Sequence, residues 1–263
     1  MVFNMEVIAK KSFGQNFLIN KKIQKLIVEA AEVKDEDVIE IGPGLGAITN
    51  LIINEVKTLD AYELDKEIFS LWIEKKLPQN INFINQDFLE SNLAFDSKRV
   101  VVGNIPYNIT SPIIFKLIEN HHFIKRATIM VQKEVGERLI AIIGTKSYSK
   151  LSVSIQSVAK VSKVLVAKSS DFSPAPKVDS MVVKIEFFEN LDFNLDNFLL
   201  FIKKCFQFKR KKLINNLLSD YDKDTIIKIF NDLNINLLVR PENISIAEYK
   251  QLFLEFSKII KNS

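Results

Sequence analysis

Residue types that support several common protein chemistries are scarce in this chain of 263 residues. With a single cysteine, Cys205, a disulfide within the chain is impossible and a cysteine-based metal site is not expected. The histidines number two, His121 and His122, and such an isolated pair does not make a metal site. We therefore expect a protein that works without a bound metal and in a reducing compartment.

Long hydrophobic runs are also missing from the sequence. No stretch approaches the ~18 consecutive apolar residues that a membrane-spanning helix requires. The segment from Met1 to Lys11 carries charges at Glu6, Lys10 and Lys11 and lacks the long apolar centre of a secretory signal. These absences predict a cytoplasmic protein that does not act in a membrane.

The charge balance is mildly basic, with a formal net charge of +4 and a pI of about 8.9. Its distribution is more informative, because residues 203–212 hold six lysines and arginines with Phe206 and Phe208 between them. One interpretation is a solvated helix face with Phe206 turned inward. The other is a patch that contacts nucleic-acid phosphates.

Short apolar runs alternate with helical patterns through the first half of the chain. The runs predicted to be strands are Asp37–Ile41, Leu59–Leu64, Ile81–Gln86, Arg99–Gly103 and Ala127–Val131. The helical patterns between them include Ile23–Ala31, Ala47–Val56 and Ser111–Asn120. This alternation predicts a doubly wound α/β domain with a mostly parallel sheet.

The pattern changes after Ser157. Ser157–Lys168 and Asp179–Phe188 are rich in valine and predict two antiparallel strands added at the end of the sheet. Helical periodicity follows over Asn197–Leu218, Lys223–Leu233 and Ser245–Lys261. We place a domain boundary near Asn190, which gives an α/β domain over residues 1–190 and a small helical domain over residues 191–263.

The segment Glu40–Gly46 follows the first predicted strand and contains Gly42, Gly44 and Gly46. Glycines in such a turn let the backbone approach a ligand closely. The next strand ends near Glu63, whose carboxylate can accept two hydrogen bonds from a ribose diol. The glycine spacing differs from the pyrophosphate-binding form, which favours a nucleoside without phosphates, such as S-adenosylmethionine; the alternative is a tight structural turn beside a solvent-exposed Glu63.

Asn104-Ile105-Pro106-Tyr107 comes directly after the fourth predicted strand. The Asn104 side-chain oxygen and the carbonyl of Ile105 or Pro106 can accept hydrogen bonds from the exocyclic amine of adenine, and Tyr107 can stack on the base. Two acceptors on that amine pull its nitrogen toward pyramidal geometry and aim its lone pair, so the work is positioning and electrostatics. The alternative is a structural Asn-Pro turn.

Four polar positions fall at the ends of four successive predicted strands: Gly42, Glu63, Asp87 and Asn104. The carboxyl ends of parallel strands form the ligand-binding edge of a doubly wound sheet. Asp87 can accept from a cofactor's adenine amino group with Phe88 beside the ring, although an Asp in this place is more often a helix N-cap. We expect these four positions to meet in one site.

Taken in order, these motifs resemble those of the ribosomal RNA adenine N6,N6-dimethyltransferases, which comprise a housekeeping small-subunit branch and antibiotic-resistance relatives. The resemblance covers nearly the whole chain, with further matches at Lys11–Leu18, Val131–Leu139 and Phe172–Ser180. The fold that it implies is a Rossmann-like class I methyltransferase sheet followed by a small all-helical domain.

The resemblance also implies roles for individual residues. The cofactor-binding positions that it implies are Asn16, Leu18, Gly42, Gly44, Glu63, Asp87, Phe88 and Asn104. The positions around the target base are Asn104, Pro106, Tyr107 and Phe172, with Phe172 stacking on the far face of the base.

Two later segments, Phe206–Leu217 and Arg240–Ser245, resemble the housekeeping branch more than the resistance enzymes. They give the candidate RNA contacts Lys209, Arg210, Lys211, Lys212 and Arg240. The resemblance thus implies a monomeric enzyme that dimethylates N6 of two adjacent adenosines near the 3′ end of small-subunit ribosomal RNA, during ribosome assembly.

Three alternatives remain open from the sequence. The first is a resistance methyltransferase that acts on large-subunit ribosomal RNA. The second is methylation of DNA adenine or of a protein glutamine amide by the same Asn-x-Pro-Tyr chemistry. The third is a non-catalytic ribosome assembly factor, which the intact Asn104–Tyr107 motif disfavours.

Overall fold

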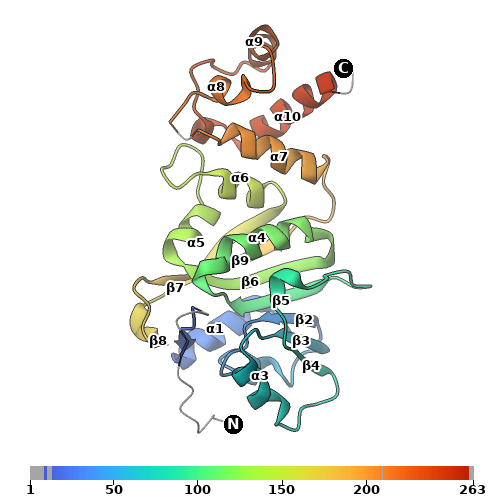
Figure 1. Cartoon of the computed structure of the whole chain (residues 1–263), viewed down its shortest axis with the longest axis vertical. Helices are drawn as coiled ribbons and strands as arrows, with labels where there is room; N and C mark the ends of the chain where they lie inside the picture. The colour runs from blue at the N-terminus through green and yellow to red at the C-terminus, as the bar shows by residue number, and fades with distance from the viewer. Residues whose placement is uncertain (1–8, 11–13, 209, 261–263) are drawn as a thin grey trace. The chain divides into compact units, whose positions relative to one another are not determined.

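A computed structural model describes residues 9–10, 14–208 and 210–260 of the chain (Figure 1). The chain divides into two compact units, each described here by itself. The first, called the sheet unit, comprises Met1–Gly136 and Ala159–Phe187. The second, called the helical unit, comprises Glu137–Val158 and Phe188–Ser263. In the described part of the chain, no helix is both long and apolar enough to cross a membrane.

A mixed β-sheet forms the centre of the sheet unit. Its strands in chain order are β2 (Asp37–Ile41), β3 (Thr58–Tyr62), β4 (Ile81–Ile84), β5 (Arg99–Asn104), β6 (Ile124–Gln132), β7 (Ala159–Ala167) and β9 (Ser180–Phe187). Among the described residues these seven strands lie in the order β4-β3-β2-β5-β6-β9-β7. The strands from β2 to β6 are parallel, whereas β9 runs antiparallel to both β6 and β7.

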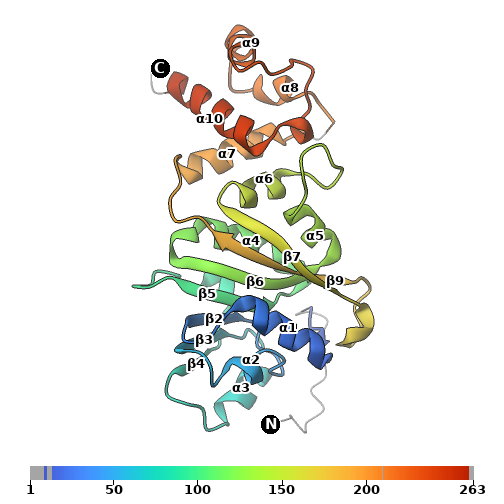
Figure 2. The same cartoon turned by 180° about the vertical axis from the view of Figure 1, so that it is seen from behind.

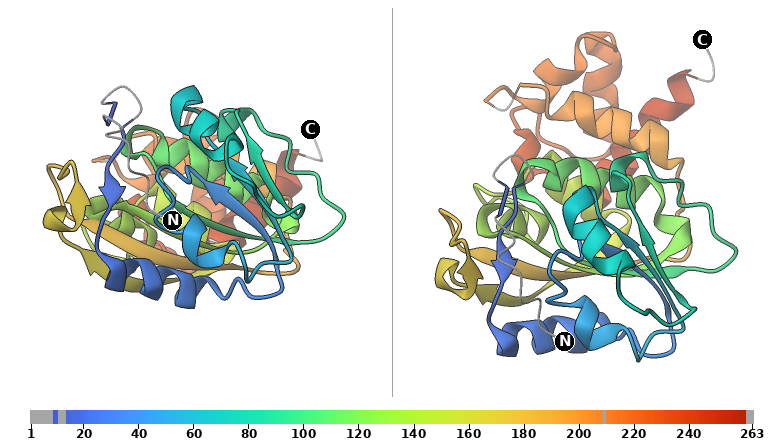
Figure 3. Two further views of the ribbon diagram at one scale, coloured as in Figure 1. Left: turned by 90° about the horizontal axis from the view of Figure 1, so that it is seen from below. Right: turned by 60° about the horizontal axis from the view of Figure 1, so that its bottom comes forward.

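Burial on both faces explains why the central strands are continuous apolar runs. All five residues of β2 are buried, as are Val100, Val101 and Val102 of β5. Helix α1 (Lys21–Ala31) covers one face of the sheet and helix α4 (Thr110–Glu119) covers the other, as Figures 1, 2 and 3 agree. The remaining helices of this unit are α2 (Thr49–Ile52) and α3 (Lys66–Ile73), and α5 (Lys133–Leu139) begins in it.

A second, two-stranded sheet joins β1 (Phe17–Leu18) to β8 (Phe172–Ser173) in antiparallel register. Asn20, just after β1, caps α1, because its side-chain oxygen accepts from the N–H groups of Lys22 and Ile23. Its amide nitrogen donates to Asp171, just before β8, at 2.7 Å. The N-terminal segment is thereby tied to a distant part of the chain at the point where α1 begins.

The helical unit packs around its own aromatic core. Its helices are α6 (Lys150–Gln156), α7 (Leu195–Cys205), α8 (Leu213–Leu217), α9 (Lys223–Asp232) and α10 (Ile246–Ile260). The side chains of Phe198, Phe230, Tyr249 and Phe256 are fully buried, and Cys205 lies among them with no exposed surface. The amphipathic spacing in α7, α9 and α10 predicted this packing.

The expected fold class is confirmed, and so are the five parallel strands and the antiparallel pair after Ser157. Three helices differ from expectation. The helix predicted over Ala47–Val56 is a single turn, α2, and α3 was not predicted. The helix predicted over Asn197–Leu218 is two helices, α7 and α8, and the basic residues Arg210, Lys211 and Lys212 lie in the segment between them rather than on a helix face.

The chain passes from the sheet unit to the helical unit between Phe187 and Phe188, close to the position expected near Asn190, and one earlier segment is grouped differently from expectation. The segment Glu137–Val158, expected in the first domain, groups with the C-terminal helices. The physical reason is side-chain packing, since Ala141, Tyr148 and Val153 are buried in the same hydrophobic cluster as α7 and α10. A sequence pattern read locally does not reveal which core a segment joins.

The C-terminal end of α1 is held by a buried guanidinium. Arg126 on β6 is 7% exposed and donates to the carbonyl oxygens of Ala31, the last residue of the helix, and of Glu32, its C-cap. It also donates to the Glu36 carboxylate at 3.1 Å. A cation here satisfies otherwise unpaired carbonyls and opposes the negative end of the helix dipole.

We expect Arg126→Met to lower the free energy of unfolding by about 2 kcal/mol, because the carbonyl oxygens of Ala31 and Glu32 lose their donor, whereas Glu36 keeps its ion pair with Lys125. Lys125 also pairs with Glu36, at 2.6 Å, but its side chain is 52% exposed. Lys125→Met is therefore the matched control, with an expected loss below about 1 kcal/mol. Urea unfolding measures both losses, and equal losses would contradict the role given to Arg126.

Candidate active site

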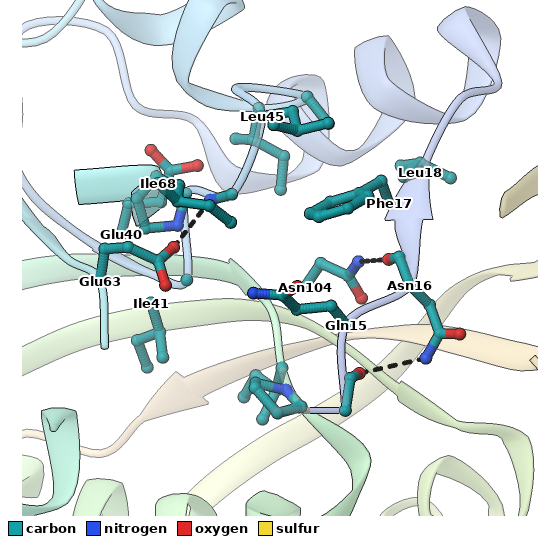
Figure 4. Close-up of a pocket in the computed structure, with 18 of the residues that line it drawn as sticks. Gln15, Asn16, Phe17, Leu18, Glu40, Ile41, Leu45, Glu63, Ile68 and Asn104 are labelled. Atoms are coloured by element: carbon teal, nitrogen blue, oxygen red, sulfur yellow. Dashed lines mark hydrogen bonds between the residues drawn. The ribbon is translucent and has the colours of Figure 1, made fainter. Parts of the chain in front are cut away.

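A cavity of about 420 Å³ opens at the carboxyl edge of the parallel strands in the sheet unit (Figure 4). This volume lies within the range of small-molecule binding sites. Its walls come from the N-terminal segment around β1 and from the segments that follow β2, β3, β4 and β5. The predicted residues that line it are Asn16, Leu18, Gly42, Gly44, Glu63, Asp87, Phe88, Asn104, Pro106 and Tyr107. The structure therefore brings the four strand-end positions together.

The glycine loop after β2 is fixed by side chains from two helices. Trp72 on α3 donates its indole N–H to the Gly44 carbonyl oxygen at 2.8 Å, and Asn50 on α2 donates to the Gly46 carbonyl oxygen at 2.7 Å. Gly46 has φ +87°, and a Cβ there would lie 2.4 Å from the Asn50 amide nitrogen. Only glycine fits such a position, so the loop can pass close to these side chains and still expose its backbone to the cavity.

Glu63, just after β3, lines the cavity beside the glycine loop, to which it is hydrogen-bonded (Figure 4). It accepts from the N–H of Gly44 at 3.1 Å and from the N–H of Asp65 at 2.9 Å, and it is 7% exposed. Burial raises the pKa of this carboxyl, while the two backbone N–H groups act in the opposite direction. The carboxylate is thus oriented in advance and still borders the space where a ligand hydroxyl can reach it.

Glu40, in β2 directly below the loop, is a second buried acid of this wall. It is 1% exposed, and its Oε2 atom has no hydrogen-bond partner among the described residues. Burial raises the pKa of Glu40 to about 8, and the nearby negative charge of Glu63 adds to the effect. The carboxyl is therefore mostly protonated at neutral pH, which removes the cost of a buried, unpaired charge.

Asp87 and Phe88 follow β4 at the next strand of the edge. Asp87 Oδ1 accepts from the N–H of Leu89 at 2.9 Å and so caps a short 3-10 turn over Phe88–Glu90. Both interpretations of Asp87 are compatible, because one carboxylate oxygen caps the turn and the other remains for a ligand amine. The ring of Phe88 meets Tyr62 edge to face, with centroids 5.5 Å apart.

Asn104, the last residue of β5, is oriented by the N-terminal segment. Its amide nitrogen donates to the Asn16 carbonyl oxygen at 2.8 Å (Figure 4). A backbone carbonyl can only accept, so this bond assigns the nitrogen and the oxygen of the side-chain amide. The Asn104 side-chain oxygen is consequently the atom left to receive a donor from a bound ligand.

The turn after Asn104 distinguishes two candidate carbonyl acceptors. The Pro106 carbonyl oxygen already accepts from the Ile109 N–H at 3.2 Å and from the Thr110 hydroxyl at 3.2 Å. That hydroxyl has a single proton, which it shares with the Tyr107 carbonyl oxygen at 3.3 Å, so the Pro106 oxygen is engaged by one full donor and one shared donor. The Ile105 carbonyl is therefore the better second acceptor for a base amine.

Tyr107 is anchored through its hydroxyl. Its Oη lies 2.6 Å from the hydroxyl oxygen of Ser180, a fully buried residue at the start of β9. Burial raises the pKa of the Tyr107 phenol, and the Ser180 hydrogen bond partly opposes this. The phenol therefore stays neutral, and the hydrogen bond fixes the direction of the ring at the cavity wall.

The structure does not bring Phe172 to the cavity. In the small antiparallel sheet Phe172 stands directly opposite Leu18, and side chains opposite each other project from the same face. Both side chains are 3% exposed and lie in the core that α1 covers. Phe172 is thus absent from the residues that line the cavity, and its stacking on the far side of a target base stays a prediction.

The candidate RNA contacts belong to the helical unit, apart from Lys209, which lies outside the described residues. Arg210, Lys211, Lys212 and Arg240 are all exposed. The N–H of Leu213 donates to the Val239 carbonyl oxygen at 2.8 Å, which places Lys212 beside Arg240 although 28 positions separate them. Phe206 is turned inward against Tyr249, as expected, whereas Phe208 is 49% exposed.

Several side chains of the site carry no sequence signal. Phe17 lies on the cavity wall, and its ring would be 3.4 Å from a Cβ at Gly44. Trp72 is 99% buried in the core, and its N–H also holds the glycine loop. Tryptophan, phenylalanine and asparagine are common in cores and turns, so pattern alone does not single them out.

Sheets with this strand order, ended by an antiparallel pair, are those of class I methyltransferases, and the cavity lies where such folds bind S-adenosylmethionine. The fold and the site thus define a class of methyl-transferring enzymes. The profile of the family described as "Ribosomal RNA adenine dimethylase" matches residues 7–258, and the chain belongs to this family. The predicted family, the methylation of ribosomal RNA adenine and the use of S-adenosylmethionine are thereby confirmed.

Individual proteins similar to the chain agree with this assignment. The ribosomal RNA small subunit methyltransferase A of Metamycoplasma arthritidis is 53% identical over 251 residues, which cover 95% of this chain and 96% of that protein. The protein of the same description from Mycoplasma mobile is 46% identical, over 94% of this chain and 98% of that protein.

Two solved structures are similar along nearly the whole chain. A dimethyladenosine transferase from Plasmodium falciparum superposes with a TM-score of 0.80 and 28% identity, over 92% of this chain and 98% of that one. The 23S rRNA methyltransferase ErmE superposes with a TM-score of 0.72 and 25% identity, over 92% of this chain and 100% of that one. Both branches named by the sequence resemblance therefore share this architecture.

We expect Ser180→Ala to lower kcat about fivefold, because one net hydrogen bond of about 1 kcal/mol no longer fixes the Tyr107 ring. Affinity for S-adenosylhomocysteine should not change. Tyr107→Phe removes the same bond from the other side, so the double variant should be no slower than either single variant. Additive losses in this cycle would separate the two residues functionally.

Proposed function

We propose that the chain transfers methyl groups from S-adenosylmethionine to N6 of two adjacent adenosines near the 3′ end of small-subunit ribosomal RNA, dimethylating each. The choice of the small subunit as substrate follows the descriptions of the relatives, which name that subunit. It also includes a cytoplasmic monomer that acts on the subunit during assembly.

The observation that carries the proposal is the orientation of Asn104. Its amide nitrogen is held by the Asn16 carbonyl, so its oxygen is free to accept from an adenine amine. With the Ile105 carbonyl as second acceptor, the two N–H bonds of that amine point in fixed directions. The nitrogen then becomes pyramidal, so that its lone pair is less delocalised into the ring and is aimed at the methyl group, and the preset acceptors need no reorganisation during the reaction.

The remaining wall of the cavity fits a nucleoside cofactor residue by residue. The Glu63 carboxylate suits the ribose diol, the unused oxygen of Asp87 suits the adenine amine, and the backbone around Asn16 suits the methionine end. When bound, S-adenosylmethionine supplies an activated methyl group with its own leaving group. The protein therefore needs neither a metal nor a strong base, only acceptors that orient the amine.

The same acceptors explain why two methylations can occur and a third cannot. A monomethylated amine keeps one N–H for Asn104 or Ile105, so it can still be held and react again. A dimethylated amine has no N–H, which leaves a buried acceptor unpaired and disfavours retention of the product. The relative affinities of unmodified, monomethylated and dimethylated RNA report this directly.

The helical unit is the proposed RNA-binding part. Lys211, Lys212 and Arg240 are exposed on this unit, and among the described residues no ion pair with an acidic side chain is found for them. Cations in this state suit contacts with phosphates. Such contacts position the RNA and carry little sequence information. The choice of adenosine then comes from the cavity, whereas the choice of ribosomal subunit comes from shape and charge.

We expect Asn104→Ala to reduce kcat at least about a thousandfold, as for the loss of an essential oriented acceptor, while S-adenosylhomocysteine still binds within about threefold of the original affinity. Asn82→Ala is the control, because Asn82 is an exposed amide on β4 outside the cavity lining. Calorimetry and single-turnover kinetics measure the two quantities. A parallel loss of cofactor affinity would give Asn104 a cofactor role instead.

The proposed address is tested by incubating the protein with labelled S-adenosylmethionine and with unmethylated small- or large-subunit particles. We expect label in adjacent N6-dimethyladenosines of the small subunit. Label in the large subunit would support the resistance branch, whose member ErmE shares the fold. Methylation of DNA or of a glutamine amide, assayed in parallel, would replace the RNA assignment altogether.

A further inference from the structure

Lys116, on helix α4, reaches a turn that belongs to the cavity wall. Its ammonium donates to the carbonyl oxygen of Leu89 at 2.9 Å and to that of Ser91 at 2.6 Å. It also lies 5.7 Å from the centroid of the Phe88 ring. No motif or spacing in the sequence singles out this lysine, which stands among apolar residues of the helix.

The turn that Lys116 holds is short and has few means of its own to stay in place. It is a 3-10 helix of one turn over Phe88–Glu90, with Asp87 as its N-cap and Ser91 as its C-cap. Helices of this type are brief and have poor hydrogen-bond geometry. The Ser91 hydroxyl donates to the Phe88 carbonyl oxygen at 2.6 Å, which closes the turn on itself but does not fix it to the sheet.

The energetic setting shows that the contact is not a loose surface pair. Lys116 is half-buried, and burial lowers the pKa of its ammonium, while the charges of Asp87 and Glu119 act in the opposite direction. An ammonium has three N–H donors, and two of them are used on backbone carbonyls that a turn would otherwise leave unpaired. Moving the turn would therefore cost both the carbonyls and the cation their partners.

The position of this turn determines the direction of the Asp87 side chain. One Asp87 oxygen is committed to the Leu89 N–H, so the direction of the other follows from the position of the turn. The Phe88 side chain, which is 4% exposed and packs against Tyr62, anchors the same segment in the core. We propose that Lys116 is a positioning residue that sets the selectivity of the cofactor pocket for adenine, by fixing the turn that aims Asp87.

This inference rests on the proposed function, in which Asp87 accepts from the cofactor's adenine amine. It adds a specificity element supplied from α4 by a residue that is not among those lining the cavity. Its consequence is selective: without Lys116 the pocket keeps Glu63 and the glycine loop, so the ribose and methionine parts still bind. What is lost is the discrimination between adenine and a purine that lacks the 6-amino group.

The test is a thermodynamic cycle in which the Kd values of two ligands are compared between the unaltered chain and a Lys116 variant. Calorimetry gives the Kd of S-adenosylhomocysteine and of its analogue in which hydrogen replaces the 6-amino group. For the unaltered chain we expect the analogue to bind about tenfold more weakly or worse, because a charged acceptor loses its donor. For Lys116→Met we expect that ratio to fall to about twofold, since a displaced Asp87 makes the hydrogen bond poorly.

Further variants keep the result interpretable. Lys116→Arg should preserve most of the tenfold ratio, because its guanidinium can donate to both carbonyls. Lys116→Gln should give an intermediate ratio, and it replaces Lys116→Met in the test if that variant folds poorly. Lys125→Met, which alters an ion-paired lysine outside the cavity lining, should keep the full ratio. In Asp87→Ala, the ratio should be near one and Lys116→Met should lower it no further.

The possible failures are distinguishable. A full tenfold ratio in Lys116→Met and Lys116→Gln overturns the inference and leaves the proposed function intact. A ratio near one in the unaltered chain overturns the adenine role of Asp87, and the inference falls with it. Failure of S-adenosylhomocysteine to bind the unaltered chain would overturn the proposed use of the cavity itself.

Discussion

The register of β2 between β3 and β5 is the constraint on which the site depends. Ile41 pairs with Tyr62 on one side and with Gly103 on the other, all in parallel strands. The residues that follow these three must therefore emerge at one edge, which puts the glycine loop, Glu63 and Asn104 within reach of one ligand. The complete burial of β2 enforces this register, because a slip by one residue would turn Glu40 and its apolar neighbours to the wrong faces.

A common design unites the polar residues at that edge. Each has one polar group tied to the backbone: Asn104 through its nitrogen to Asn16, Asp87 through one oxygen to Leu89, and Glu63 to the loop amide of Gly44. The tie fixes the orientation of the side chain before any ligand arrives. Binding then loses little side-chain entropy, and the transferring atoms can be aligned by a rigid wall.

The sequence predicted what depends on local pattern and strand ends, and missed what depends on packing. Gly42, Glu63, Asp87 and Asn104 could be placed together because parallel strands have only one carboxyl edge. Phe172 could not be placed, because its direction follows from pairing with Leu18, 154 positions earlier. Trp72 acts through one hydrogen bond to a backbone carbonyl and Lys116 through two, and such bonds leave no periodicity or spacing in a sequence.

The burial of Cys205 has a practical consequence for the helical unit. Its thiol has no exposed surface, and burial raises its pKa well above the usual range, so the folded chain offers no thiolate to an alkylating reagent. Because Cys205 is the single cysteine of the chain, any labelling must come from molecules in which that core has opened. The rate of thiol labelling therefore reports how often the core of the helical unit opens.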